Sequence, residues 1–369
     1  MKGRVWQDPR CGDYVVILEL GKHPDGRRNA PWVGRFEKRT EAETHLIQCL
    51  HELQENTYVE SSVITVAEWC ERWLRDYIPL AVAETTLEQY RKMVHHHIVS
   101  ELGPIKLQKL DKPTIQRAIT AWSKTLAPST TRQVTSICKA MLKEAVASGI
   151  IKRNPAQSVV LPRVERREMR ALDEQQTVAL LDQLVGNKLY LPALIAVSTG
   201  MRRGEILGLK WTAIQDGVAT VTEAISCNGQ VRPPKSELGR RRIVLPPSVV
   251  VALEDRRAAQ EVERQLAGNI WKDTGYVFTR ADGSPWSAND ISCNWTRTMK
   301  RLGIKLRFHD LRHTHATQLL SAGMHVKAVA ARLGHDPGET LRTYAHVLPG
   351  MDEQAAEIAE GIIASRNTT

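Results

Sequence analysis

A charged, proline-interrupted segment near the middle of the chain constrains its folding more than any other feature. Residues 153–171, RNPAQSVVLPRVERREMRA, have the composition of a linker. The stretches on either side are each long enough to bury a core, and 369 residues correspond to two or three domains of ordinary size. We therefore expect separately folded parts joined at this segment.

The stretch at residues 1–57 predicts a small α+β domain. Residues 14–20, YVVILEL, are rich in strand-forming side chains, the turn sequence HPDG follows, and a second short run lies near Trp32. Thr40 and Glu43 have the spacing of a capping box, so we expect a helix to open there, with Ile47 on its apolar face. A three-stranded sheet packed on one helix fits this length.

The remaining stretches predict mostly helical domains. Residues 62–152 carry apolar side chains at helical spacing, including Trp69 and Trp73, and form an all-helical domain. Residues 172–350 are mostly helical, with strands expected at 218–224 and 241–245. Residues 351–369 end the chain with an amphipathic helix. The expected fold is a multidomain protein, mainly α with small β-sheets.

The charge balance favours a polyanionic partner, most often nucleic acid. The formal net charge is +10, and residues 61–165 hold fifteen Lys and Arg against nine Asp and Glu. The longest apolar run, residues 189–197, is too short for a membrane span, which needs about 18 residues. The six cysteines lack CxxC spacing, so we expect reduced thiols, no metal site and a cytoplasmic protein.

Four separated motifs in the last large domain carry side chains that can take part in catalysis. The first is STGMRRGE at residues 198–205, and the second is Lys235, which we expect at a hairpin tip between two strands. The third is HDLR at residues 309–312, which opens a helix. The fourth is LGH at residues 333–335, with Tyr344 nine residues after the histidine. These motifs can act together only if the fold brings their side chains to one site, each in the position that its chemical role requires.

In this order and at these spacings, the motifs resemble the signature of tyrosine recombinases, the phage integrase family. The resemblance covers residues 62–350, and residues 1–57 are similar to the arm-type DNA-binding domain of such integrases. It implies site-specific cutting and rejoining of DNA through a 3′-phosphotyrosyl intermediate, with no cofactor, metal or ATP. The implied catalytic residues are Arg202, Lys235, His309, Arg312, His335 and Tyr344, with Glu205 in a supporting role.

The residue types suit that chemistry. Attack on a phosphodiester needs a nucleophile, stabilisation of charge at phosphorus and a proton for the leaving 5′ oxygen. The phenol of Tyr344 would attack, and the planar guanidinium groups of Arg202 and Arg312 would bind the non-bridging oxygens. The resemblance implies that Lys235 is the general acid. It also implies that the two histidines donate to the phosphate or move protons, while Glu205 orients an arginine.

The resemblance also implies partners and an assembly. Core-type attachment sites would be bound by residues 62–152, and arm-type sites by residues 1–57. Since the latter have no net positive charge, arm binding would need a local cluster, namely Arg27, Arg28, Arg35, Lys38 and Arg39. We expect a homotetramer on double-stranded DNA, joined through the tail at 351–369. DNA-bending and directionality factors, and a place at the bacterial nucleoid, would fit the same function.

Several alternatives stay open at the level of sequence. Lys210 and the arginines at 240–242 could replace Lys235, and we interpret Arg203 as an ordinary surface charge. The histidines at 309, 313 and 315 could in principle bind a metal, although their spacing is not helical throughout. A Xer-like resolvase, a type IB topoisomerase and a DNA-binding regulator on the same fold are the rival functions.

Overall fold

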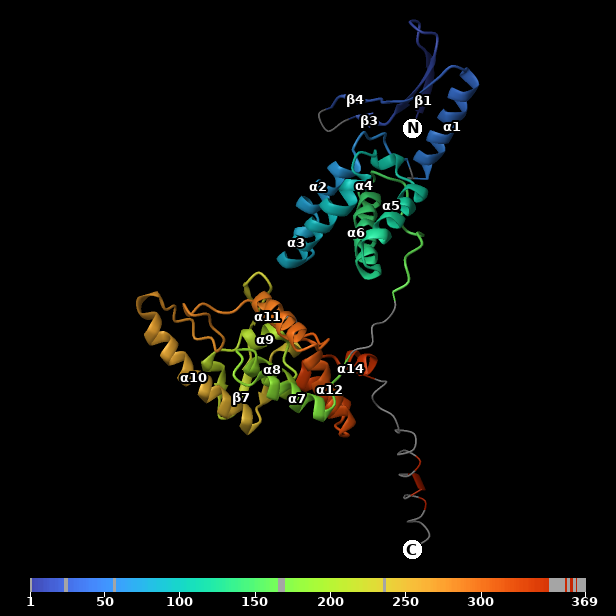
Figure 1. Cartoon of the computed structure of the whole chain (residues 1–369). Helices are drawn as coiled ribbons and strands as arrows, with labels where there is room; N and C mark the ends of the chain where they lie inside the picture. The colour runs from blue at the N-terminus through green and yellow to red at the C-terminus, as the bar shows by residue number, and fades with distance from the viewer. Residues whose placement is uncertain are drawn as a thin grey trace. The chain divides into compact units, whose positions relative to one another are not determined.

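The computed structural model describes residues 2–22, 26–55, 58–164, 170–234 and 237–344, with the single residues 356, 359, 360 and 363. The chain divides into two compact units, residues 1–166 and 167–369 (Figure 1). The described elements are mostly helices with small sheets, which confirms the predicted fold class. Within the described ranges, no helix is both long and apolar enough to cross a membrane.

The first unit begins with a three-stranded antiparallel sheet, in the order β1-β2-β5, packed on one helix. The elements are β1 (Lys2–Gln7), β2 (Tyr14–Glu19), β5 (Trp32–Phe36) and α1 (Arg39–Gln54), with a separate ribbon of β3 (Gly21–Lys22) and β4 (Arg28–Asn29). Helix α1 covers the sheet face that bears Gly3, where a Cβ atom would lie 2.5 Å from Leu46 Cδ1. The predicted sheet and helix are both present.

The beginning of α1 differs from the predicted capping box. The helix starts at Arg39, one residue before Thr40, and no side chain caps it. Glu43 pairs instead with Arg39, whose Nε lies 2.8 Å from Glu43 Oε1. An i,i+4 ion pair and a capping box compete for the same glutamate here, and the ion pair wins. Ile47 is 68% exposed, so its place on the apolar face was also wrong.

The rest of the first unit is a helical bundle. Its elements are α2 (Val66–Asp76), η1 (Ile78–Leu80), α3 (Glu84–Met93), the π-helical η2 (Val94–Val99), α4 (Ser100–Leu102), η3 (Leu107–Lys109), α5 (Lys112–Thr125) and α6 (Pro128–Ala147). Trp69 and Trp73 are buried in the core, as expected. The indole of Trp69 donates to the carbonyl of Met141 at 3.1 Å, which ties α2 to α6.

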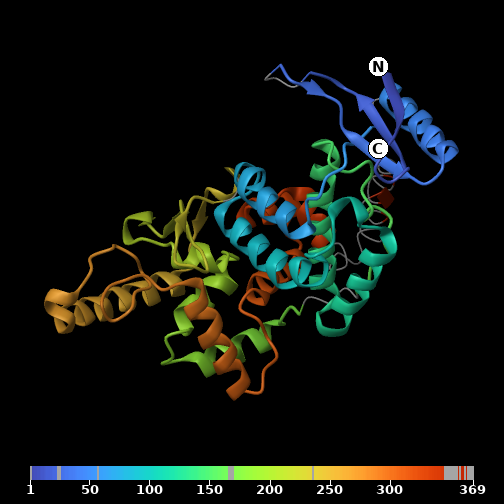
Figure 2. The same cartoon turned by 90° about the horizontal axis from the view of Figure 1, so that it is seen from above.

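The second unit packs its helices around α8, which is buried along most of its length. Its helices are α7 (Glu174–Leu184), α8 (Tyr190–Thr199), α9 (Arg203–Leu207), η4 (Trp211–Ala213), η5 (Glu237–Gly239), α10 (Pro247–Ala267), η6 (Gly268–Ile270), α11 (Ala288–Arg301), α12 (Asp310–Ser321), α13 (Val326–Leu333) and α14 (Pro337–Tyr344). The far end of α10 projects from this unit (Figure 2). The following loop returns along α10, since Gln260 donates to the carbonyl of Tyr276.

Two small sheets lie beside these helices. β6 (Ile214–Gln215), β7 (Val218–Val221) and β10 (Arg241–Val244) form an antiparallel sheet in the order β10-β7-β6. β8 (Ala224–Ile225) and β9 (Val231–Arg232) form a separate hairpin between β7 and β10. The predicted strands are therefore present. Lys235, which follows this hairpin, lies outside the described residues, as does most of the predicted tail helix.

Candidate active site

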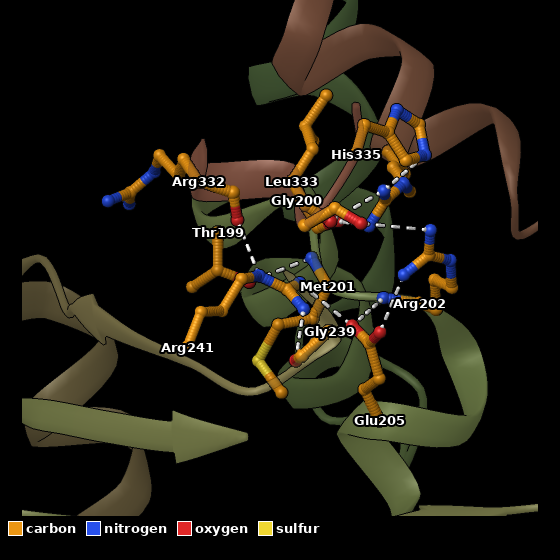
Figure 3. Close-up of polar contacts among 12 residues, drawn as sticks. Thr199, Gly200, Met201, Arg202, Glu205, Gly239, Arg241, Arg332, Leu333 and His335 are labelled. Atoms are coloured by element: carbon orange, nitrogen blue, oxygen red, sulfur yellow. Dashed lines mark hydrogen bonds and ion pairs between the residues drawn. The ribbon is translucent and has the colours of Figure 1, made fainter. Parts of the chain in front are cut away.

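The first motif forms the turn between α8 and α9. Helix α8 ends at Thr199, and Gly200 follows with φ of 67°, a left-handed conformation that favours glycine. A Cβ atom at Gly200 would also lie 2.6 Å from side-chain atoms of His315 and Leu333. The close turn places Arg202 at the N-terminus of α9 (Figure 3).

Glu205 fixes the orientation of Arg202. Its Oε2 accepts from the backbone N–H of Arg202 and its Oε1 accepts from Arg202 Nη1, both at 2.9 Å. Burial works to raise the pKa of Glu205, but hydrogen bonds and charges from Arg241 and Arg202 outweigh it, so the pKa lies below its ordinary value. The carboxylate is ionised and almost fully buried, while the side chain of Arg202 stays 40% exposed.

Arg312, the arginine of the third motif, lies in the interior on α12. It is 2% exposed and donates to the carbonyls of Gly200 at 2.6 Å and Leu333 at 2.7 Å. Burial, followed by the charge of Arg202, lowers its pKa to about 9, so it stays charged at neutral pH. A buried cation with two neutral carbonyl partners leaves its positive charge uncompensated locally.

His335 follows α13 directly and faces Arg312. Arg312 Nη2 lies 2.7 Å from His335 Nε2, and because a guanidinium can only donate, Nε2 must accept and the ring proton must be on Nδ1. Burial and the charges of Arg312 and Arg202 lower the pKa of His335 to about 3. Among the described residues, Nδ1 is buried with no hydrogen-bond partner. An orphaned buried donor beside two arginines suits an incoming phosphate oxygen.

A cleft of about 1360 Å³ opens beside this cluster. Arg202, Arg203 and His309 contribute to its wall, together with basic side chains such as Lys300 and Arg307. Loss of hydration lowers the pKa of His309 to about 4, with help from the charges of His313 and Arg312. The cleft is therefore positively charged through its arginines and lysines, while its histidine is neutral at pH 7.

Tyr344 ends α14 and is 1% exposed. Its hydroxyl lies 2.7 Å from His313 Nδ1, and the two rings are tilted against each other. Burial raises the pKa of Tyr344 to about 12, although the charge of Arg312 works to lower it. Burial also lowers the pKa of His313, so the phenol is neutral and its partner is a neutral imidazole.

The structure thus brings together most of the residues singled out in the sequence. Arg202, Glu205, Arg312 and His335 share direct contacts or a common backbone turn. His309 and Tyr344 both contact His313, which follows Arg312 in the chain. Lys235 lies outside the described residues. The histidines at 309, 313 and 315 do not form one ligand set, because the ring of the third binds the carbonyl of residue 197 and a neighbouring arginine.

Two residues of the cluster were missed in the sequence. His313 contacts the phenol, and Arg241 donates to Glu205 Oε2 at 2.8 Å (Figure 3). The run of arginines at 240–242 was noted only as a substitute for Lys235. The alternation of side chains along β10 could have identified Arg241 as the buried arginine, because it lies on the same face of the strand as the buried Ile243.

Comparison with known proteins identifies the family of the chain. The model of the phage integrase family matches residues 170–350, and that of the N-terminal SAM-like domain of phage integrases matches residues 65–123. A tyrosine recombinase XerC-like protein of Caldanaerobacter subterraneus is 26% identical over 93% of this chain and 95% of its own length. An integrase of Streptomyces ambofaciens is 25% identical over 98% of this chain and 96% of its own.

Solved structures show the same fold. The Tn1549 transposon integrase in complex with a circular intermediate DNA superposes with a TM-score of 0.69 at 21% identity, covering 80% of this chain and 99% of that one. A lambda integrase tetramer bound to a Holliday junction superposes with a TM-score of 0.59 at 20% identity, covering 91% and 94%.

The family model and these relatives show that the chain is a tyrosine recombinase, an enzyme that cuts and rejoins DNA at specific sites. Within that class, the chain belongs to the phage integrase family.

Proposed function

We propose that this enzyme is the integrase of a phage or integrative element and that Tyr344 is its nucleophile. One observation carries the proposal. Arg202 and Arg312 donate to the consecutive carbonyls of Gly334 and Leu333, and His335 is the next residue along the chain. Two cations and an orphaned donor therefore face one small volume, which suits the oxygens of a single phosphate.

In the proposed cleavage step one bond forms at phosphorus, one bond breaks and two protons move. The oxygen of Tyr344 bonds to phosphorus, and the bond from phosphorus to the 5′ oxygen breaks. The phenolic proton leaves to a neighbouring base, and His313 is the nearest acceptor in this conformation. Lys235 supplies the proton that the leaving 5′ oxygen takes up. The product is a 3′-phosphotyrosyl bond, and attack by another 5′ hydroxyl reverses the step without external energy.

The test is adduct formation on a nicked duplex that carries the attachment site, with metals chelated. The wild-type enzyme should form a covalent protein–DNA species that survives denaturation, and Tyr344→Phe should bind the duplex without forming it. Tyr190→Phe, which removes a hydroxyl elsewhere in the same unit, is the matched control and should react normally. Adduct formation by Tyr344→Phe at the wild-type rate would remove the mechanism.

We assign core-site binding to the helical domain at 62–152 and catalysis to residues 172–350. The helical domain carries the largest surplus of basic over acidic residues for its length, and phosphate contacts of such residues make affinity fall with salt. Two separate family models, which match residues 65–123 and 170–350, support a division of the chain at the same place. Binding of core-site duplexes should therefore weaken steeply as the salt concentration rises.

The arm-type function of residues 1–57 has a different basis from the cluster predicted in the sequence. Four basic residues of that cluster lie against carboxylates, in the pairs Arg28–Glu19, Arg35–Asp8, Lys38–Glu41 and Arg39–Glu43. The sheet face opposite α1 instead carries Lys2, Arg4 and Trp6 on β1 and Trp32 on β5, all exposed. We propose that this open face of the sheet meets arm-type DNA.

The assembly and place of action follow from the same function. A strand exchange joins four DNA ends, and a homotetramer that cuts one strand from each duplex supplies the required nucleophiles. The lambda integrase structure on a Holliday junction is a tetramer, and the relatives come from bacteria and phages. We propose that the tail at 351–369 joins protomers and that the enzyme acts at the nucleoid in the bacterial cytoplasm, with bending and directionality factors.

A Xer-like resolvase is the second candidate, because one relative with high coverage is named XerC-like. The two functions differ in their substrates. An integrase joins two different attachment sites, whereas a resolvase exchanges strands between two copies of one site. Recombination assays with unlike and like pairs of sites therefore separate them, and efficient exchange between like pairs only would favour the resolvase.

A further inference from the structure

A third arginine, Arg241, lies close to Arg202 and Arg312 but has not been given a role. Arg241 begins β10, directly after the η5 turn, and its side chain is 7% exposed. Each guanidinium nitrogen has a partner: Nε donates to the carbonyl of Arg332 at 2.6 Å, Nη1 to that of Gly239 at 3.1 Å, and Nη2 to Glu205 at 2.8 Å (Figure 3). Because all three nitrogens of this guanidinium already donate to protein groups, we infer that any role of Arg241 in the reaction passes through these partners.

The first partner is the carboxylate that orients Arg202. Glu205 Oε2 accepts from both Arg241 and the backbone of Arg202, while Oε1 accepts from the Arg202 side chain. One buried anion is therefore shared between two arginines. Without Arg241, burial would disfavour the ionised carboxylate, and a protonated Glu205 would hold Arg202 less firmly.

The second partner is the end of α13. Three consecutive carbonyls there, at residues 332, 333 and 334, accept from Arg241, Arg312 and Arg202 respectively. The last carbonyls of a helix lack partners within the helix and carry its negative partial charge, so they suit cations. Arginines from three different elements are thereby gathered on one helical turn.

Gly334 makes the close approach of Arg241 to this turn feasible. It has φ of 66°, and a Cβ atom there would lie 2.9 Å from Arg241 Nη1 and 2.8 Å from the carbonyl oxygen of Leu238. Glycine therefore satisfies both the left-handed turn and the packing against Arg241. The same turn leads directly into His335, so Arg241 supports both sides of the phosphate site.

We propose that Arg241 is a positioning residue, which holds Glu205 and the turn at 332–334 so that Arg202, Arg312 and His335 face one phosphate. The inference rests on the proposed function, since it presumes that this cluster binds the scissile phosphate. An arginine is required because one planar group must donate in three directions, which a lysine ammonium on a flexible stem cannot reproduce.

The test compares single-turnover cleavage of saturating nicked attachment-site DNA between pH 5 and 8. Arg241→Met should cut about 10- to 100-fold more slowly while binding DNA nearly as well, because supporting contacts typically matter on that scale. Without Arg241, the pKa of Glu205 rises. The variant should therefore lose activity progressively as the pH falls through that raised value, and regain part of it at higher pH.

Matched variants separate positioning from a general loss of charge or fold. Arg242→Met removes the same charge from the exposed neighbour in β10 and should show neither the slow cleavage nor the new pH dependence. Arg241→Lys should recover part of the rate. In a Glu205→Gln background, Arg241→Met should add no pH dependence, because the titrating carboxylate is gone. Should Arg241→Met fold poorly, the rate and pH profile of Arg241→Lys decide.

The Tyr344 adduct of the wild-type enzyme tests the proposed function, whereas the rate and pH profile of Arg241→Met test the role of Arg241. If wild-type enzyme forms the Tyr344 adduct and folded Arg241→Met cuts at the wild-type rate with an unchanged pH profile, Arg241 has no positioning role and the proposed function stands. If the wild-type enzyme forms no Tyr344 adduct, the proposed function falls, and this inference falls with it.

Discussion

The arginines at the end of α13 and those of the N-terminal sheet domain carry the same charge but differ in what surrounds them. Arg28, Arg35 and Arg39 are exposed, and each lies against its own carboxylate. Around α13, Arg202 and Arg241 share the carboxylate of Glu205, while the partners of Arg312 are two carbonyls and the ring of His335. One region is neutralised, while the other keeps a surplus of two positive charges for an anion.

The comparison shows why charge counts along a sequence are a weak guide to anion sites. A carbonyl that accepts a hydrogen bond orients a guanidinium but leaves its positive charge in place. A carboxylate orients the guanidinium and also neutralises its charge. An enzyme that stabilises negative charge on a phosphate in the transition state benefits from carbonyl partners, because its arginines then keep their positive charge. Substitutions in the two regions should therefore differ in effect, and the largest effect is expected where the charge is most deeply buried.

The largest effect is expected for Arg312→Met. The substitution removes a cation from the phosphate site and leaves the carbonyls of Gly200 and Leu333 without their donor. Cleavage should fall by about 10³-fold, and the free energy of unfolding by about 2–4 kcal/mol. Adduct formation and urea unfolding measure the two effects. Arg297→Met, on the exposed face of α11, should change neither, and a folded Arg312→Met that cuts normally would contradict the account.

A loss of about 10²- to 10³-fold is expected for Arg202→Ala on ordinary DNA. If the guanidinium of Arg202 offsets the negative charge of the phosphate, cleavage at a neutral methylphosphonate should depend less on Arg202. The variant should therefore lose much less activity on that substrate than on the phosphodiester. Arg203→Ala is the adjacent control. Equal losses on both substrates would mean that Arg202 acts in some other way.

A moderate effect of pH on stability is expected from His315. It is buried between the carbonyl of Val197 and Arg332, and burial lowers its pKa to about 4. Between pH 6.5 and 4 the unfolded chain binds a proton here that the folded chain does not, so stability falls as the pH falls. The loss should reach at most about 3 kcal/mol. Urea unfolding of His315→Gln and of exposed His96→Gln, measured against wild type, should show that only the former flattens the profile.

The smallest effect is expected for Arg39→Ala in the N-terminal domain. Its ion pair with Glu43 is exposed, so the substitution should leave stability almost unchanged and alter arm-DNA affinity by less than about twofold. Arg4→Ala, on the open sheet face, should weaken arm-DNA binding more and reduce its salt dependence. The reverse order of these two variants in a binding titration would favour the cluster predicted from sequence.

The fold class, and most of the residues that the structure brings together in the candidate site, could be predicted from the sequence, because motifs consist of side chains. Arg202, Glu205, Arg312 and His335 were all found in this way. The carbonyls of α13 that gather the arginines could not be found, since a backbone group has no sequence signature. Arg241 was hidden for a related reason: three adjacent arginines look alike until the register of β10 buries one of them.

The most direct measurement identifies the peptide left on DNA after cleavage. Nicked attachment-site DNA is incubated with the wild-type enzyme, the covalent species is digested with trypsin, and the 3′ end is examined by mass spectrometry. We predict peptide 343–366, joined to the 3′ phosphate through Tyr344. Attachment through any other residue, or a free 3′ phosphate with no peptide, would contradict the account.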